Sequence, residues 1–150
     1  MTIAFRSAEF SDVNLLVQLN KALHKLEGTN YDTERARAAF KGFIGHPELG
    51  EIWMICDDGV PIGYIVMNRG YSIQFGGPYA LVDEMYLEDK YRERGIGRQS
   101  LEFVEEHCRF SNMTALYLEI TRENMAAQGF YQRMGFTHRE QYTTMVKPLN

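Results

Sequence analysis

The amino-acid sequence predicts an α/β (α+β) fold, with a mostly antiparallel sheet of six or seven strands and about four helices over residues 1–150. β-rich runs and helical periodicities follow one another in the order β, α, α, β, β, β, α, β, α, β, β. The chain is 45% hydrophobic and 24% charged, which is ordinary for one globular domain of 150 residues. It contains no internal repeat and no low-complexity linker, so we expect a single domain.

The first third of the chain predicts one short strand and two helices. The strand covers residues 3–6. Asp12 offers N-cap chemistry for a helix that Gly28 ends, and a second helix begins near Asp32 and stops before Pro47. The apolar face of the first helix is formed by Val13, Leu16, Leu19 (or Asn20) and Leu23.

The rest of the chain is richer in strands. Residues 51–57 and 60–68 are joined at Asp58-Gly59, which is a strong hairpin signal. A turn-rich connection covers residues 70–78. The remaining elements are a strand at 80–87, a helix from Gly97 with Leu101, Val104 and Cys108 on one face, a strand at 114–120, a helix at 124–134 closed by Gly135, and a final β pair at 136–138 and 141–146.

Composition narrows the class of protein. A net charge of −4 argues against non-specific nucleic-acid binding, where basic domains are the rule. No apolar run is long enough for a membrane span, and the first residues do not form a signal peptide, so we expect a cytoplasmic protein with no membrane partner. The two cysteines and four histidines show no zinc-ligand spacing, so we expect reduced buried thiols and no metal.

The heptad at residues 92–98 has the composition of an anion-binding site. It reads Arg92-Glu93-Arg94-Gly95-Ile96-Gly97-Arg98 and stands at the start of a predicted helix. A helix start presents unpaired N–H groups and partial positive charge, and glycines let an anion approach the backbone. The three arginines add fixed charge, so the heptad suits a pyrophosphate with a further phosphate nearby.

Three other interpretations compete for this heptad. A Walker P-loop requires GxxxxGK[ST], which is absent. A dinucleotide-binding fold requires GxGxxG directly after a strand, whereas Ser100 takes the third glycine position and seven residues separate the strand from Gly95. Glu119 does lie near the distance expected for a ribose-binding acid, so this alternative stays open. A helix start with surface arginines is the third alternative.

Two motifs resemble the GNAT superfamily of N-acetyltransferases. Its cofactor signature, [QR]-x-x-G-x-[GA], is matched by Arg92, Gly95 and Gly97. The run from Asn124 to Phe136 is similar to the family pattern N-x-x-[AS]-x-x-[FL]-Y-x-x-x-G-F, with Gln128-Gly129 replacing the more usual residues. The resemblance implies the GNAT fold, with the sheet splayed between its fourth and fifth strands.

The resemblance also implies roles for particular residues. The backbone of Met85, Tyr86 and Leu87 would bind the pantetheine arm of acetyl-CoA as an added strand would, with the pyrophosphate on residues 92–98. Tyr131 has the position of the general acid that protonates the leaving thiolate, and Asn124 would both cap its helix and contact the cofactor.

Asp83 and Glu84 interrupt an otherwise apolar strand, and a carboxylate there can take the proton of an amine nucleophile. Neighbouring strand residues face opposite sides, so only one of the two can serve. The run Leu-Val-Asp-Glu-Met-Tyr-Leu at residues 81–87 resembles the equivalent strand of the spermidine/spermine acetyltransferases and related bacterial proteins. On this resemblance, Asp83 matches the position of their base glutamate. We therefore favour Asp83, acting through a water because its side chain is shorter.

These observations predict an enzyme that transfers the acetyl group of acetyl-CoA to a primary amine by direct attack in a ternary complex. The acceptor would be a small amine, polyamine or amino acid, bordered by the loop at 26–34 with Glu27, Tyr31, Asp32 and Glu34. The alternatives are a protein lysine or N-terminal acetyltransferase and a non-catalytic acyl-CoA-binding module. We expect a homodimer.

Overall fold

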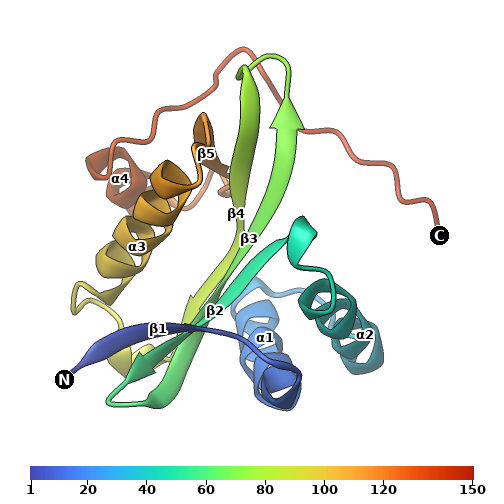
Figure 1. Cartoon of the computed structure of the whole chain (residues 1–150), viewed down its shortest axis with the longest axis vertical. Coiled ribbons are helices and arrows are strands. Elements are labelled where there is room, and N and C mark those ends of the chain that lie inside the picture. Colours follow the sequence, from blue (N-terminus) through green and yellow to red (C-terminus); the bar gives the residue numbers. More distant parts are fainter. The chain divides into compact units, whose positions relative to one another are not determined.

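The computed structural model describes residues 1–150 as two compact units, 1–119 and 120–150 (Figure 1). Residues 1–119 contain a five-stranded sheet in the order β1-β2-β3-β4-β5. Its strands are β1 (Ile3–Ser7), β2 (Gly50–Asp57), β3 (Val60–Ser72), β4 (Gly77–Leu87) and β5 (Ala115–Leu118). All neighbouring pairs are antiparallel except β4 and β5, which run parallel. The predicted fold class is confirmed.

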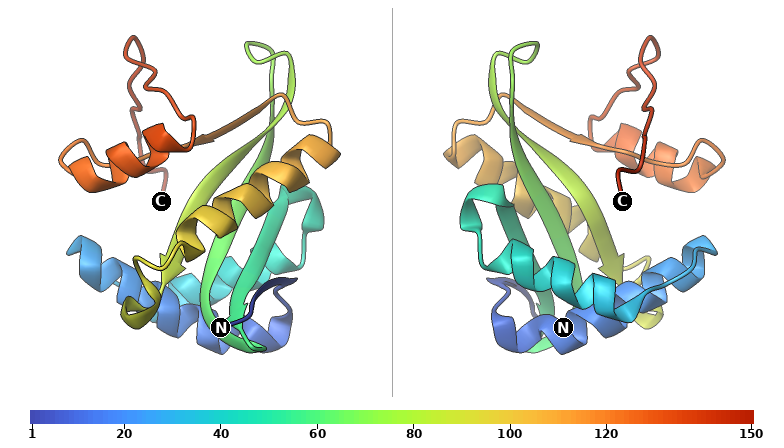
Figure 2. Two further views of the ribbon diagram at one scale, coloured as in Figure 1. Left: turned by 90° about the vertical axis from the view of Figure 1, so that its left-hand side faces the viewer. Right: turned by 90° about the vertical axis from the view of Figure 1, so that its right-hand side faces the viewer.

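Helices cover both faces of this sheet. Helices α1 (Val13–Glu27) and α2 (Thr33–Ile44) lie on one face, and α3 (Ile96–Phe110) lies on the other (Figures 1 and 2). Short 3₁₀ turns at Phe10–Asp12, Pro47–Leu49 and Asp89–Tyr91 connect the elements. No helix combines the length and the apolar character that a membrane crossing requires.

Each face of the sheet packs its own set of side chains. Under α1 and α2, Leu16 and Phe40 pack in one cluster with Met54 and Val66 from the strands. On the opposite face, the Trp53 ring meets Phe103 of α3 edge-on at 5.2 Å between centroids. Alternation along β2 produces this division, because successive side chains of a strand point to opposite faces.

Local signals in the sequence placed most boundaries correctly. Asp58 and Gly59 have φ angles of 51° and 84°, as a tight hairpin between β2 and β3 requires. Gly28 ends α1 in the left-handed region with φ of 71°. The Asp32 side chain accepts a hydrogen bond from the backbone N–H of Arg35 at 3.1 Å and caps α2. The β3–β4 connection is tighter than the predicted 70–78, because β3 continues to Ser72 and β4 begins at Gly77.

Strand β4 contains a β-bulge at Asp83. Glu84 pairs with Val66 of β3 and Val82 pairs with the next residue, Met67, so Asp83 has no partner across the ladder. Val66 belongs to the core under α1 and α2, whereas the Met67 sulfur lies 3.8 Å from the Cys108 sulfur of α3. The side chain of Glu84 therefore lies on the face covered by α1 and α2, and that of Val82 lies on the face covered by α3. In a regular strand, residues two apart would share one face.

Strand β4 also extends beyond the end of its parallel neighbour, β5. The pairing with β5 runs from Tyr79 with Ala115 to Val82 with Leu118 and then stops. Residues 83–87 keep β3 on one side and have no strand on the other. The predicted splay between the fourth and fifth strands is confirmed.

Residues 120–150 contain helix α4 (Met125–Arg133). The Asn124 side chain caps it by accepting a hydrogen bond from the Ala127 N–H at 3.0 Å, and Gly135 follows with φ of 98°. No strand follows Gly135, so the predicted β pair at 136–138 and 141–146 is wrong and the sheet has five strands instead of six or seven. Apolar Met145 and Val146 are 90% and 86% exposed, so they form no buried strand face here.

Candidate active site

The open edge of β4 presents backbone groups next to a polar side chain cluster. Met85, Tyr86 and Leu87 pair with β3 through residues 63–65 and have no strand on their other side. The carbonyl of Leu87 accepts a hydrogen bond from Arg92 Nε at 3.0 Å. Successive residues of a strand direct their backbone groups to opposite sides, and the Glu88 N–H donates to the Ile62 carbonyl beside β3, so the Tyr86 groups also point to β3. The backbone groups of Met85 and the N–H of Leu87 are thus the ones available to an extended ligand.

The heptad at residues 92–98 forms the turn into α3. Glu93 and Gly95 are both left-handed, with φ of 60° and 80°, and no side chain caps the helix. The first backbone hydrogen bond is donated by Gln99 to the Gly95 carbonyl, which leaves the N–H groups of Ile96, Gly97 and Arg98 without an intrahelical acceptor. This turn fits an anionic ligand by geometry and by the positive end of the helix dipole.

The three arginines of the heptad differ in their contacts. Arg92 is tied to Leu87 and to Asp89 at 3.3 Å, and its guanidinium lies 5.4 Å from the centre of the Tyr86 ring. Arg98 pairs with Glu102 along the exposed side of α3 at 3.0 Å. Arg94 forms no ion pair and lies 5.9 Å from the Tyr91 ring centre. Arg94 is therefore the heptad arginine with its charge least engaged within the chain.

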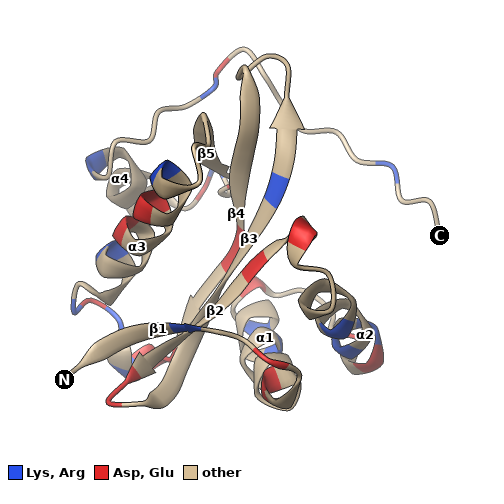
Figure 3. Cartoon of the chain, in the orientation of Figure 1, with Lys and Arg blue, Asp and Glu red and all other residues tan.

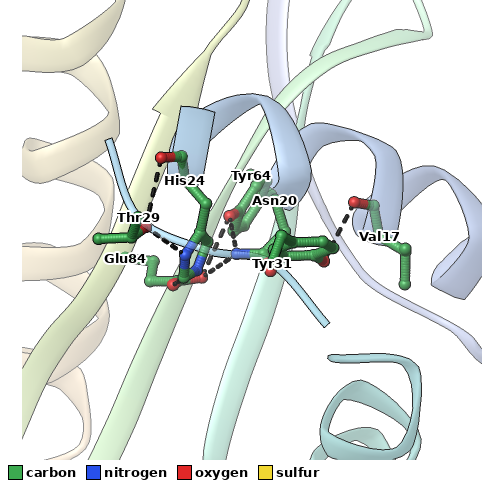
Figure 4. Close-up of polar contacts among 7 residues, drawn as sticks. All are labelled: Val17, Asn20, His24, Thr29, Tyr31, Tyr64 and Glu84. Carbon is green, nitrogen blue, oxygen red and sulfur yellow. Dashed lines mark hydrogen bonds and ion pairs between the residues drawn. The ribbon is translucent and has the colours of Figure 1, made fainter. Parts of the chain in front are cut away.

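Glu84 is held by partners from two other elements (Figure 4). Its Oε1 accepts hydrogen bonds from Asn20 Nδ2 of α1 at 2.9 Å and from the Tyr64 hydroxyl of β3 at 3.1 Å. Asn20 Nδ2 also donates to the Tyr64 oxygen at 2.9 Å, which closes a three-membered network. Asn20 and Tyr64 are buried, so their dipoles are fixed. The other oxygen, Oε2, faces His24 Nε2 at 4.0 Å.

Burial raises the pKa of Glu84, and the like charge of Asp83 adds to the rise, while the hydrogen bonds from Tyr64 and Asn20 oppose it. A quarter of the Glu84 side chain remains exposed. Burial also raises the pKa of Tyr64, so this phenol stays protonated and can donate to Glu84. A carboxylate with these properties is suited to accept a proton from a bound group.

Asp83 is exposed and has no hydrogen-bond partner, although partial desolvation raises the pKa of its carboxyl. The bulge removes the strict alternation on which the sequence argument for opposite faces depended, because an inserted residue interrupts the two-residue period. Acidic positions interrupt β4 as predicted (Figure 3, red), but only Glu84 is engaged by other elements.

Tyr131 and Asn124 belong to the unit of residues 120–150. Tyr131 is on α4, 5.2 Å from the Phe130 ring and 5.8 Å from the Phe136 ring between centroids. Burial raises the pKa of Tyr131, so its phenol is protonated near neutral pH. Asn124 caps α4, as the sequence predicted.

Neither cysteine chemistry nor a metal cluster is prepared in this structure. Cys56 and Cys108 are free and buried, and burial raises the pKa of both thiols, which suppresses the nucleophilic thiolate. The chain has no group of three or more His, Cys, Asp or Glu side chains that could hold a metal ion.

The sequence did not predict the partners of Glu84. Asn20 is 64 residues away from Glu84 and Tyr64 is 20 residues away, and no local pattern connects such distances. One signal was present: Asn20 is a polar residue at the apolar face of the first helix. In the loop after α1, Asp32 caps α2 and Glu34 lies 3.8 Å from Arg37, so these acids have structural partners.

Comparison with known proteins agrees with this geometry. The sequence profile of the Acetyltransferase (GNAT) family matches residues 16–136, so the chain belongs to that family. An uncharacterized N-acetyltransferase of Methanocaldococcus jannaschii is 24% identical over 143 residues, or 93% of this chain. The chain spans 38% to 62% of the length of the curated relatives it matches.

Solved structures share the fold. An integron cassette protein from the mobile metagenome of Cole Harbour salt marsh is 30% identical with a TM-score of 0.85, covering 97% of this chain and 90% of that one. A predicted acetyltransferase of Clostridium acetobutylicum, solved with acetyl-CoA, has a TM-score of 0.80 at 17% identity, covering 97% and 96%. The latter likeness shows the fold alone.

Proposed function

We propose that the chain is an acetyltransferase that moves the acetyl group of acetyl-CoA to a primary amine by direct attack in a ternary complex. The observation that carries the proposal is the Glu84 carboxylate, held by Asn20 and Tyr64 at the start of the open edge of β4. Membership of the GNAT family and the acetyl-CoA bound to the similar Clostridium acetobutylicum structure support it.

The residues of this chain fit acetyl-CoA. The uncapped N–H groups of residues 96–98, together with Arg94, would hold the pyrophosphate. The backbone of Met85 and the N–H of Leu87 would hydrogen-bond the pantetheine amides, and one N–H there would polarise the thioester carbonyl. Bound acetyl-CoA supplies an activated acyl carbon and a thiolate leaving group. Arg92 would keep the end of β4 in place through the Leu87 carbonyl.

Glu84 is the better candidate for the base, in place of the sequence-based preference for Asp83. Its Oε1 is fixed by two donors, so Oε2 keeps one orientation toward a bound amine. The raised pKa brings its proton affinity nearer to that of the group it must deprotonate. Asp83 would then act mainly through its charge, which contributes to the raised pKa of Glu84.

Tyr131 would serve as the acid that protonates the thiolate. Its buried phenol stays protonated, as a proton donor must. Tyr131→Phe should lower kcat more than it raises KM for acetyl-CoA, because the hydroxyl matters most as negative charge develops on sulfur. An unchanged kcat, with acetyl transfer shown to be rate-limiting by single-turnover kinetics, would remove Tyr131 from this role.

Direct transfer is favoured over an acetyl-cysteine intermediate because both thiols are buried and have raised pKa values. Mass spectrometry of the protein, quenched after mixing with acetyl-CoA alone, should show no acetylated cysteine. An acetyl adduct on Cys56 or Cys108 would contradict the ternary-complex mechanism.

The acceptor we propose is a small alkylamine or polyamine, in keeping with the resemblance of β4 to the spermidine/spermine acetyltransferases. We also propose that residues 1–150 act as one domain in the cytoplasm. The domain would form a homodimer, and light scattering would measure its molar mass. Release of CoA thiol should be measured with diamines, polyamines, amino acids and lysine peptides. Turnover only with peptides would favour a protein acetyltransferase, and CoA binding without any turnover would favour a non-catalytic acyl-CoA-binding module.

A further inference from the structure

His24 lies beside Glu84 and has not been assigned a role. It comes from the last turns of α1, with its ring 5.1 Å from the Tyr31 ring between centroids (Figure 4). Its Nε2 faces Glu84 Oε2 at 4.0 Å, and its side chain is one-third exposed. The pair therefore joins a half-buried carboxylate to a ring that reaches solvent.

The tautomer of neutral His24 follows from its other contact. The Thr29 hydroxyl donates its single proton to the backbone carbonyl of His24 at 3.2 Å. The same oxygen lies 2.8 Å from His24 Nδ1, and with its proton on that carbonyl it can only accept, which assigns the ring N–H to Nδ1. Nε2 then carries a lone pair, and this lone pair is directed at the space beside Glu84 Oε2. Donation by Thr29 to Nδ1 would instead put the ring N–H on Nε2, and the first test below distinguishes the two tautomers.

Two acceptors at this spacing match one ammonium group. A nitrogen about 2.8 Å from each of two acceptors that are 4.0 Å apart sees them at an angle of about 90°, close to the tetrahedral arrangement of N–H bonds. A primary ammonium has three N–H groups and can satisfy both acceptors. A trimethylammonium group has none and cannot.

We propose that Glu84 Oε2 and His24 Nε2 together bind the ammonium group of the acceptor, and that His24 passes its proton to solvent. This inference rests on the proposed function and specifies its acceptor as a primary alkylamine. Glu84 takes one proton from R–NH₃⁺, passes it to Nε2, and regains its charge, and the imidazolium releases the proton to water. The amine forms the C–N bond as the C–S bond breaks. The second proton leaves nitrogen for Glu84 and reaches water by the same route. Tyr131 gives its proton to the thiolate and takes one back from water, so each turnover releases one proton.

The groups around this pair are consistent with that route. Tyr64 and Asn20 occupy Oε1, so the proton enters and leaves at Oε2. Asp83 adds negative charge near Glu84, which favours the ammonium form on arrival. The Tyr31 hydroxyl donates to the Val17 carbonyl at 3.2 Å, and this hydrogen bond holds the Tyr31 ring beside His24. The charge of Arg37 partly offsets the burial that raises the pKa of Tyr31. No Lys or Arg side chain pairs with Glu84.

The first test needs no turnover. Long-range ¹H–¹⁵N NMR of the histidine rings at a pH where they are neutral should show His24 with its proton on Nδ1. Thr29→Val should shift the population toward the Nε2–H tautomer, whereas Thr29→Ser should keep the parental spectrum. An Nε2–H tautomer in the parent protein would overturn the proposal.

The second test uses butylamine as the probe and butyltrimethylammonium as its matched control. Butylamine alone should shift the His24 ring resonances, and His24→Gln should raise KM for butylamine and lower kcat on the order of tenfold. Added imidazole should restore part of kcat in His24→Gln, which a purely structural loss would not allow. His46→Gln, an exposed histidine paired with Glu48, is the control and should match the parent.

The outcomes separate this inference from the proposed function. Shifts at His24 without acetylation of butylamine would keep the amine subsite and reject acetyl transfer. Acetylation with a parental kcat and KM in His24→Gln would keep the enzyme and reject the role of His24. Equal shifts from butylamine and butyltrimethylammonium would reject the two-acceptor subsite.

Discussion

The two halves of β4 differ in their pairing and in their side chains. Residues 79–82 are paired on both sides, and Ala80 and Val82 are buried. Residues 83–87 have β3 on one side only, and they begin with a bulge and two carboxylates. Structural support and chemistry are therefore divided between the two halves of one strand. Its doubly paired half anchors the sheet, and its singly paired half leaves backbone and charge available to ligands.

The largest effect should come from the carboxylate of the open half. Glu84→Gln keeps the shape and the acceptor oxygen for Asn20 but removes the base, so kcat/KM should fall on the order of 10²-fold or more. Asp83→Asn is the matched variant and should lose far less, since the Asp83 side chain forms no hydrogen bond or ion pair with another element. Steady-state kinetics with an active amine, across pH 6 to 9, measures both. If Asp83→Asn shows the larger loss, the sequence-based preference for Asp83 was right.

In the doubly paired half, a substitution should act on stability and leave rate constants unchanged. Ala80→Val adds two methyl groups at a position with no exposed surface, and overpacking of this kind costs about 2 kcal/mol. Urea unfolding measures the cost. Val60→Ala, at an exposed position of β3, is the control and should change stability little. A large loss of kcat in folded Ala80→Val would break the division between the halves.

Beyond the end of β4, the charge of Arg94 should matter for cofactor affinity. Arg94→Ala should weaken CoA binding at least tenfold, about 1.4 kcal/mol, and the loss should shrink as salt is added. Arg109→Ala is the control because Arg109 pairs with Glu105 in the last turn of α3. Isothermal titration calorimetry at two salt concentrations distinguishes them. Equal affinities for Arg94→Ala and the parent would place the phosphates elsewhere.

The smallest effect is a pH dependence of folding. The folded-state pKa of Glu84 is raised, so its contribution to stability is present below the ordinary glutamate pKa and is lost as pH rises through the folded value. Glu84→Gln cannot lose a proton there. Its free energy of unfolding relative to the parent should therefore increase as pH rises from about 4 to neutral. Urea titrations at several pH values check this, and a difference that falls with pH would contradict it.

Local features of the sequence could be predicted, and long-range ones could not. The Asp58-Gly59 hairpin, the Asp32 cap and the glycine turn before α3 depend on neighbouring residues, so their signals are short. The network of Asn20, Tyr64 and Glu84 depends on tertiary packing. The bulge at Asp83 has no clear sequence signature, so the parity argument that separated the two acids could not foresee it.

The buried thiols have a practical consequence for measurements of released CoA thiol. Cys56 and Cys108 are 4% and 5% exposed, so a chromogenic disulfide reagent added to the folded protein should react with released CoA and not with the chain. The same reagent also detects unfolding of a variant, because unfolding exposes the two cysteines. Both thiols then react, and the signal rises by two equivalents per chain without any amine or cofactor present. A single cuvette can thus distinguish a slow variant from a misfolded one.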